Sequence, residues 1–173
     1  MHDVFLGIGS NVGDRVRFLA GAVRKLKMLP ATELVKFSSV YETEPVGIKE
    51  QNKFLNAALW MRTTLEVKDF HARTKAIEKE IGRQESIRWG PREIDIDILL
   101  FADLIIAESN LRIPHRDMLV RRFVLQPLAE IAPEVIHPTS RQSIRELLEQ
   151  CTDESAVDRS EKLTKEFSHL CEE

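Results

Sequence analysis

Residues 94–101 read IDIDILLF, and the interpretation of the fold depends on this stretch. Apolar and acidic residues alternate strictly at its start and its end is wholly apolar, a pattern typical of a strand that enters a core. It predicts a β-strand that is half exposed where it begins and buried where it ends. Because side chains two residues apart on a strand project to one face, Asp95 and Asp97 are expected on the same side, with their Cα atoms about 7 Å apart.

Five further elements are predicted on the N-terminal side of this strand, from apolar runs and from apolar residues at helical spacing. They lie at residues 4–9 (strand), 14–26 (helix), 34–41 and 54–64 (strands that could pair as a hairpin) and 66–82 (helix). Asp14 is the expected N-cap of the first helix, and Gly82 the stop of the second. The order is typical of an α+β, ferredoxin-like β-α-β-β-α-β fold, with an antiparallel sheet and helices on one face.

The chain of 173 residues, 43% of them hydrophobic, is long enough for one core. We therefore expect a single domain over residues 1–150, with extra C-terminal helices at 121–131 and 143–149 that cover more of the sheet. Residues 151–173 are mainly charged or small, a composition that predicts a loosely docked or disordered tail.

Composition also restricts the partners. A net charge of -3 creates no overall field that would recruit nucleic acid, so any anion site must be local. The chain starts without a signal-peptide pattern and contains no apolar run of membrane-span length, so we expect a cytoplasmic protein that does not bind membranes and is a monomer by default. Cys151 and Cys171 show no Cys-x-x-Cys spacing, which argues against a disulfide framework or a zinc site.

Acidic and basic side chains gather around the predicted strand. Asp95 and Asp97 would repel each other on one face, and a divalent cation would offset this repulsion. Magnesium binds through one or two carboxylates together with substrate phosphates, and arginine guanidinium groups recognise phosphate oxygens. Arg83, Arg88 and Arg92 lie just before the strand. The cluster predicts a magnesium and phosphate site for a nucleotide; the alternative is an amphipathic strand whose aspartates simply face water.

Two other clusters offer polar groups. His115, Arg116 and Arg121 form a group of hydrogen-bond donors suited to nucleotide phosphates or ribose, unless His115 only donates within its loop. Asn56 could read the edge of a flat heterocycle through its paired donor and acceptor, with Phe54 stacking on the ring. The alternative is that Phe54 is core and Asn56 caps a turn.

Residues 7–13 read GIGSNVG, between a predicted strand and a predicted helix. The third glycine is one residue late for the dinucleotide-binding fingerprint, so we interpret the run as a tight strand-to-helix turn, and a nicotinamide-dependent oxidoreductase is disfavoured. No Gly-rich loop ends in Gly-Lys-Ser or Gly-Lys-Thr, which excludes a P-loop enzyme. A noncatalytic RNA-binding module shares the predicted element order, but the paired aspartates and the acidic charge argue against it.

Residues 88–99, RWGPREIDIDIL, closely resemble the signature of the 6-hydroxymethyl-7,8-dihydropterin pyrophosphokinases. Further matches follow in family order and cover roughly the first 150 residues. They lie at residues 5–11, 43–47, 54–58, 78–83, 114–115 and Phe123. The resemblance implies an ATP-dependent enzyme of folate biosynthesis, which transfers pyrophosphate from ATP to the hydroxymethyl group of 6-hydroxymethyl-7,8-dihydropterin and releases AMP.

The resemblance also implies roles for individual residues. Asp95 and Asp97 would hold two magnesium ions between them and the ATP phosphates, and Arg83, Arg92 and Asp97 would be catalytic. The pterin would be bound by Thr43, Val46, Phe54, Asn56 and Phe123. The ATP site would be lined by Lys75, Glu78, Arg83, Trp89, Arg92, Ile98, Arg112, His115, Arg116 and Arg121.

Four positions depart from the family pattern, one of them Glu44, where some members have proline and where the backbone is expected to do the binding. Glu85 falls in a loop where many members carry a second arginine, Lys75 replaces a glutamine near the adenine site, and Arg116 replaces a tyrosine found in some members. These last three departures concern individual ATP contacts. The polar, glycine-flanked segments at residues 43–53 and 84–89 are expected to be lids that close after ATP binds, because the reaction must exclude water.

Overall fold

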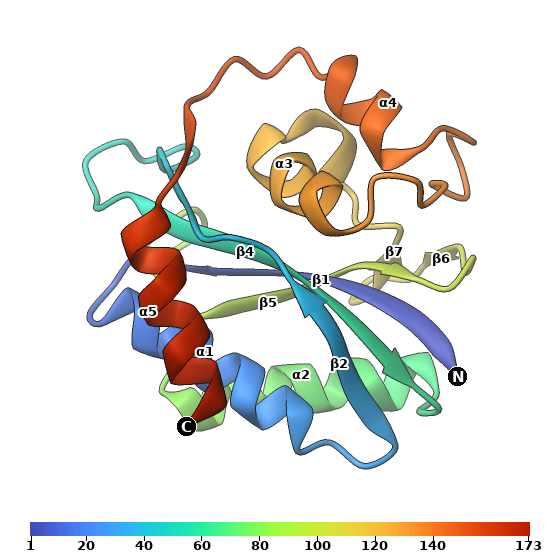
Figure 1. Ribbon diagram of the computed structural model, residues 1–173, viewed down its shortest axis with the longest axis horizontal. Helices are drawn as coiled ribbons and strands as arrows, with labels where there is room; N and C mark the ends of the chain where they lie inside the picture. The colour runs from blue at the N-terminus through green and yellow to red at the C-terminus, as the bar shows by residue number, and fades with distance from the viewer.

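The computed structural model describes all residues 1–173 and consists of a six-stranded twisted sheet with helices on both faces and a separate two-stranded sheet (Figure 1). The elements of the predicted core follow in the expected order. They are β1 (His2–Ser10), α1 (Arg15–Lys27), β2 (Thr32–Phe37), β3 (Tyr41–Thr43), β4 (Phe54–Thr63), α2 (Val67–Ile81) and β5 (Asp95–Phe101). The C-terminal part contains β6 (Ile106–Ala107), β7 (Arg112–Ile113), the 3₁₀ turn η1 (Met118–Val120), α3 (Arg122–Ile131), α4 (Ile144–Glu149), β8 (Val157–Arg159) and α5 (Glu161–Glu172).

The sheet has six strands in the order β5-β1-β4-β3-β8, with β2 also paired to β4. Both neighbours of β1, the strands β4 and β5, run antiparallel to it. This arrangement confirms the predicted α+β, ferredoxin-like class. The expected strand at 34–41 is divided into β2 and β3 by residues 38–40, where the Ser38 hydroxyl accepts a hydrogen bond from the Ala58 amide at 2.8 Å.

The predicted helix ends are confirmed by local chemistry. The Asp14 carboxylate accepts a hydrogen bond from the Arg17 amide at 3.2 Å and so satisfies one of the unpaired donors in the first turn of α1. Gly82 ends α2 with a φ of 113°, a left-handed conformation that glycine adopts without steric cost. The extra helices at 121–131 and 143–149 are also confirmed, as α3 and α4.

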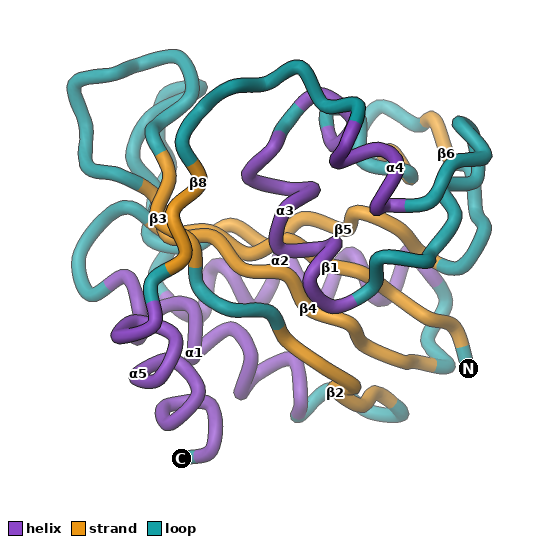
Figure 2. The backbone as a smooth tube through the Cα atoms, turned by 45° about the horizontal axis from the view of Figure 1, so that its top comes forward, coloured by secondary structure: helices purple, strands orange, loops and turns teal.

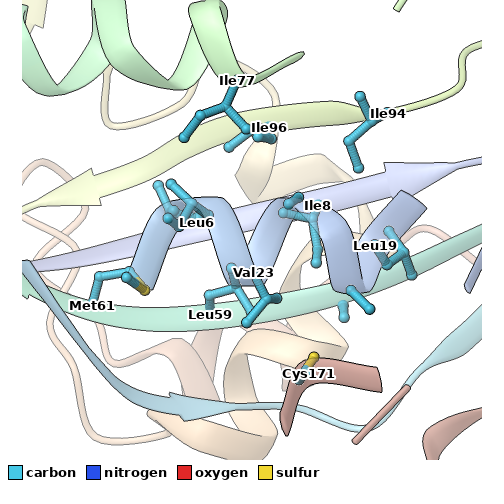
Figure 3. Packing of buried hydrophobic residues seen from close by; sticks show 14 of the residues in the cluster. Leu6, Ile8, Leu19, Val23, Leu59, Met61, Ile77, Ile94, Ile96 and Cys171 are labelled. Carbon is cyan, nitrogen blue, oxygen red and sulfur yellow. The ribbon is translucent and has the colours of Figure 1, made fainter. Parts of the chain in front are cut away.

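The two faces of the sheet have different roles. Leu6 and Ile8 of β1 point to the face covered by α1 and α2, where they pack against Val23 and Ile96 in the main core (Figure 3). A smaller apolar cluster lies on the opposite face, beneath α3 and α4. No helix of the chain is both long enough and apolar enough to span a bilayer.

The prediction of a loose tail at residues 151–173 is not what the structure shows. β8 pairs with β3 at the edge of the sheet, as Figure 2 shows, and α5 packs beside α1. Phe167, Leu170 and Cys171 of α5 are buried on one face of the helix, while its charged residues face solvent. The high overall charge therefore hid a short amphipathic helix, whose last carbonyl groups accept hydrogen bonds from α1.

We expect Phe167→Ala to lower the free energy of unfolding by about 3 to 5 kcal/mol, the usual cost of removing a buried phenylalanine ring. Phe167 is fully buried, with its ring 5.2 Å from that of Phe37 in an edge-on arrangement. Urea unfolding followed by circular dichroism would measure the change. Glu166→Ala, at the exposed neighbouring position, is the matched control and should change it by under about 0.5 kcal/mol. Equal effects of the two variants would contradict the packed tail.

Candidate active site

Glycines on the central strand lie opposite the two aspartates of β5. In the sheet register Gly9 pairs with Asp95 and Gly7 with Asp97, and Gly9 also pairs with Asn56 on the other side. Directly paired residues project to the same face. Because glycine carries no side chain, this part of β1 leaves open space between the carboxylates of β5 and the amide of β4. A cavity of about 260 Å³ lies there and is lined by all five residues.

The sequence predicts that the run GIGSNVG forms a single tight turn, and this prediction is wrong. Gly7 and Gly9 lie inside β1, and only Gly13, with a φ of 66°, lies in the turn before α1. A Cβ atom at Gly9 would lie 2.8 Å from the Asn56 Oδ1 atom. The first two glycines thus shape the floor of the cavity, and the third makes the turn.

Asp95 is held by two arginines. Its Oδ1 atom accepts a hydrogen bond from Arg83 at 2.7 Å, and its Oδ2 atom accepts one from Arg92. Arg83 also contacts the Oε2 atom of Glu78 at 2.8 Å, and Glu78 accepts a further bond from the Ile96 amide. Although burial opposes its charge, the carboxylates of Asp95 and Glu78 raise the pKa of Arg83. Glu78 is 3% exposed and does not line this cavity, so it acts on the site by holding Arg83.

Asp97 is the carboxylate without a protein partner of its own. Its carboxylate accepts no hydrogen bond, and the nearest basic nitrogen is His115 Nε2 at 3.8 Å. Its side chain is 40% exposed but lies in a concave site. The partial loss of water there and the negative charge of Asp95 raise the pKa of Asp97. His115 and Lys75 act in the opposite direction but do not cancel the rise. No group of three or more His, Cys, Asp or Glu side chains is arranged to hold a metal. Two carboxylates suit a magnesium ion that takes its other oxygens from substrate phosphates and water.

All five residues expected to bind the pterin line the 260 Å³ cavity. Asn56 donates a hydrogen bond through Nδ2 to the Thr43 hydroxyl at 2.6 Å, and Thr43 is itself buried. This contact orients the amide and leaves its oxygen available on the cavity side. Phe54 of β4 and Phe123 of α3 come from different layers of the fold, and the cavity brings them together.

Arg121 lies among aromatic rings in the same cavity. Its guanidinium carbon is 5.6 Å from the Trp89 ring centroid and 5.7 Å from that of Phe123, distances typical of cation–π contacts. Asp117, which sequence reasoning did not identify, holds this guanidinium at 3.0 Å. Trp89 has a φ of 67°, a left-handed conformation that is rare for a bulky residue and occurs most often at functional sites.

A second cavity of about 310 Å³ adjoins the first. It contains five of the residues expected to bind ATP, namely Lys75, Ile98, Arg112, His115 and Arg116. Trp89, Arg92 and Arg121, also expected to bind ATP, line the first cavity instead. Asp97 and His115 line both cavities, so the two spaces meet at these residues. Lys75 donates hydrogen bonds to Glu78 Oε1 at 3.0 Å and to the Ile96 carbonyl at 3.2 Å.

Asn11 links the first of the two expected lid segments to Arg92, which lies just beyond the second, and sequence reasoning missed it. Its Nδ2 atom donates to Gln51 Oε1 and to the Asn52 carbonyl, both at 3.0 Å, while its Oδ1 atom accepts from the Arg92 amide at 2.8 Å. Gln51 in turn donates to the Trp89 carbonyl at 2.9 Å. The partners lie far from Asn11 in the chain, so no local pattern could have identified the contact. Closure of the two segments on ATP stays a prediction.

Comparison with known proteins shows which family the chain belongs to. The family model described as 7,8-dihydro-6-hydroxymethylpterin-pyrophosphokinase matches residues 5–133. The chain belongs to this family. A 2-amino-4-hydroxy-6-hydroxymethyldihydropteridine pyrophosphokinase of Aquifex aeolicus is 44% identical over 146 residues, covering 84% of this chain and 90% of the relative. The pyrophosphokinase of the same name from Bacillus subtilis is 42% identical over 155 residues, covering 89% of this chain and 93% of the relative.

Solved structures support the fold of this pyrophosphokinase family member. The wild-type HPPK-DHPS protein of Plasmodium falciparum superposes with a TM-score of 0.69 at 16% sequence identity, over 86% of this chain. The chain corresponds to 44% of that longer protein. Membership of the pyrophosphokinase family sets aside the RNA-binding and oxidoreductase alternatives.

Proposed function

We infer that the chain is an ATP-dependent pyrophosphokinase of folate biosynthesis. It transfers the pyrophosphoryl group of ATP to the hydroxymethyl group of 6-hydroxymethyl-7,8-dihydropterin and yields the pterin diphosphate and AMP. Besides family membership, the observation that carries this conclusion is the junction of two cavities at Asp97 and His115. One cavity offers an amide and aromatic rings for a flat heterocycle, and the other offers cationic side chains for a nucleotide.

We further propose that Asp95 and Asp97 hold magnesium ions together with the ATP phosphates. The donor set supports this assignment, because two carboxylates from one strand leave most coordination positions to phosphate and water oxygens. Bound magnesium would neutralise the charge that develops on the phosphoryl oxygens. A cation at Asp95 would replace at least one of its arginine contacts, which would free Arg83 or Arg92 to bind the transferred group.

In this proposal the pterin half of the site works by orientation. Asn56, fixed by Thr43, would pair with the edge of the ring, while Phe54 and Phe123 would contact its two faces. The hydroxymethyl oxygen would then point toward Asp97, where the two cavities meet. Holding both substrates in this geometry contributes more to phosphoryl transfer than covalent chemistry by the protein.

The remaining ATP contacts are proposals of the same kind. Lys75, Ile98, Arg112 and Arg116 would surround the nucleoside. The phosphates, which extend toward the first cavity, would be bound by His115, Trp89, Arg92 and Arg121.

We also propose a cytoplasmic monomer. The support for the monomer is that residues of one chain line both cavities.

The activity is tested by separating nucleotides chromatographically after incubation of the protein with ATP, magnesium and 6-hydroxymethyl-7,8-dihydropterin. We expect AMP to form only when both the pterin and magnesium are present. Parallel reactions without the pterin, and with EDTA added, are the controls. Formation of ADP, or no nucleotide product from folded protein, would reject the assignment.

A further inference from the structure

Residues 151–159, which we call the strap, follow α4, end in β8 and run from α3 to the sheet (Figure 2). The strap lies beyond residues 5–133, the part of the chain that matches the family model. At its beginning it contacts Arg122, the first residue of α3. The Arg122 amide donates to Asp153 Oδ2 at 2.9 Å, and the guanidinium donates to the carbonyl groups of Asp153 at 2.7 Å and Cys151 at 3.1 Å.

Asp153 supplies a cap that α3 lacks locally. The residue at the N-cap position, Arg121, makes no capping hydrogen bond, and the first turn contains no acidic residue. A carboxylate at a helix N-terminus satisfies a free amide and interacts favourably with the helix dipole. The cap of α3 thus comes from a residue 31 positions later in the chain. The other carboxylate oxygen of Asp153 accepts from the Ser155 amide at 2.9 Å, which fixes its orientation.

The far end of the strap is a strand of the sheet. In β8, Val157 pairs with Thr43 and Arg159 pairs with Tyr41 on β3. The Arg159 guanidinium also donates to the Ser39 hydroxyl at 2.8 Å. Thr43 is the residue that orients Asn56, so this end of the strap supports one wall of the first cavity.

We propose that the strap positions the pterin half of the active site, with Asp153 as its main positioning residue. One end holds α3 where Arg121 and Phe123 enter the cavity, and the other end holds β3 where Thr43 enters it. The strap therefore sets the distance between the two walls that contact the heterocycle. This inference rests on the proposed function for the identity of the ligand.

The geometry makes the effect selective for one substrate. The second cavity is lined by side chains of α2 and β5 and by residues 109–116, and no hydrogen bond of the strap reaches these segments. Loosening the strap should therefore weaken pterin binding more than nucleotide binding, because Arg121 is the one proposed ATP contact that lies at the start of α3. A substitution that only lowers global stability would change the two affinities together.

The test compares Asp153→Ala, Asp153→Asn and the control Glu154→Ala, which removes an exposed carboxylate of the same strap. Pterin and ATP-analogue dissociation constants are measured by fluorescence titration, and KM and kcat from AMP formation. For Asp153→Ala we expect the pterin Kd and KM to rise about fivefold, the equivalent of one helix cap, with the ATP-analogue Kd within about twofold of wild type. Asp153→Asn, which keeps an acceptor oxygen, should lie in between, and Glu154→Ala should match wild type.

Amide hydrogen exchange, measured by mass spectrometry on the same proteins without substrates, gives a second readout. In Asp153→Ala we expect faster exchange in peptides that contain residues 41–43 and 121–124, and unchanged exchange in α2. Equal loss of pterin and nucleotide affinity, or unchanged exchange at both walls, would overturn the strap proposal. Failure of wild-type protein to form AMP would instead reject the proposed function, and the exchange data would still decide whether the strap holds the two walls.

Discussion

Replacing Asp97 with asparagine is expected to lower kcat for AMP formation at least about a hundredfold at saturating magnesium. Asparagine keeps the shape of the side chain and one acceptor oxygen but loses the negative charge that a divalent cation requires. The Asp97 carboxylate has no hydrogen bond within the protein and a raised pKa, so its charged form is less favourable in the folded state than in the unfolded state. The variant should therefore unfold at the same temperature as wild type or a higher one, while it loses turnover.

Steady-state AMP formation across a magnesium titration, with thermal unfolding of the same samples, measures both quantities. Asp103→Asn is the matched control, because Asp103 lies in an exposed turn just after β5 and makes no ion pair or side-chain hydrogen bond. It should keep wild-type kcat. If Asp97→Asn turned over at close to the wild-type rate, the assignment of magnesium to this carboxylate would have to be abandoned.

Gly9→Ala is expected to raise the KM for the pterin about tenfold or more, because the added methyl group would lie 2.8 Å from Asn56 Oδ1. The Asn56 side chain can move, so the chain should still fold. Its movement, however, would break the 2.6 Å hydrogen bond to Thr43 and turn the amide away from the cavity. We expect the KM for ATP to change much less, since Asn56 lines only the first cavity.

Gly7→Ala is the matched comparison on the same strand and the same face. A Cβ atom there would meet the nearest Leu99 side-chain atom at 3.5 Å, an ordinary van der Waals distance. Its effect on the pterin KM should be clearly smaller than that of Gly9→Ala. Kinetics with each substrate varied in turn would make the comparison, and equal effects of the two alanines would show that Asn56 is not the group disturbed at Gly9.

Several features of the site could be predicted because their signals are local. The alternation in residues 94–101 indicated that Asp95 and Asp97 share a face, and the structure places both beside one cavity. Of the residues to which the family resemblance assigned a role, all but Glu78 and Arg83 line one of the two cavities. Sequence reasoning missed Asn11, because its partners lie far away in the chain, and it also missed Asp117, although Asp117 pairs with Arg121 only four residues later.

The sequence by itself determined the main elements of the core, the shared face of the two aspartates and the family, since periods of two and of about 3.6 residues and an ordered set of motifs are visible in the chain. Only the tertiary structure decided that Gly9 lies between Asp95 and Asn56, that α5 is packed rather than loose, and that Asp153 caps α3. The physical reason is that strand register and helix docking are chosen by the packing of residues distant in sequence, and no local pattern encodes that choice.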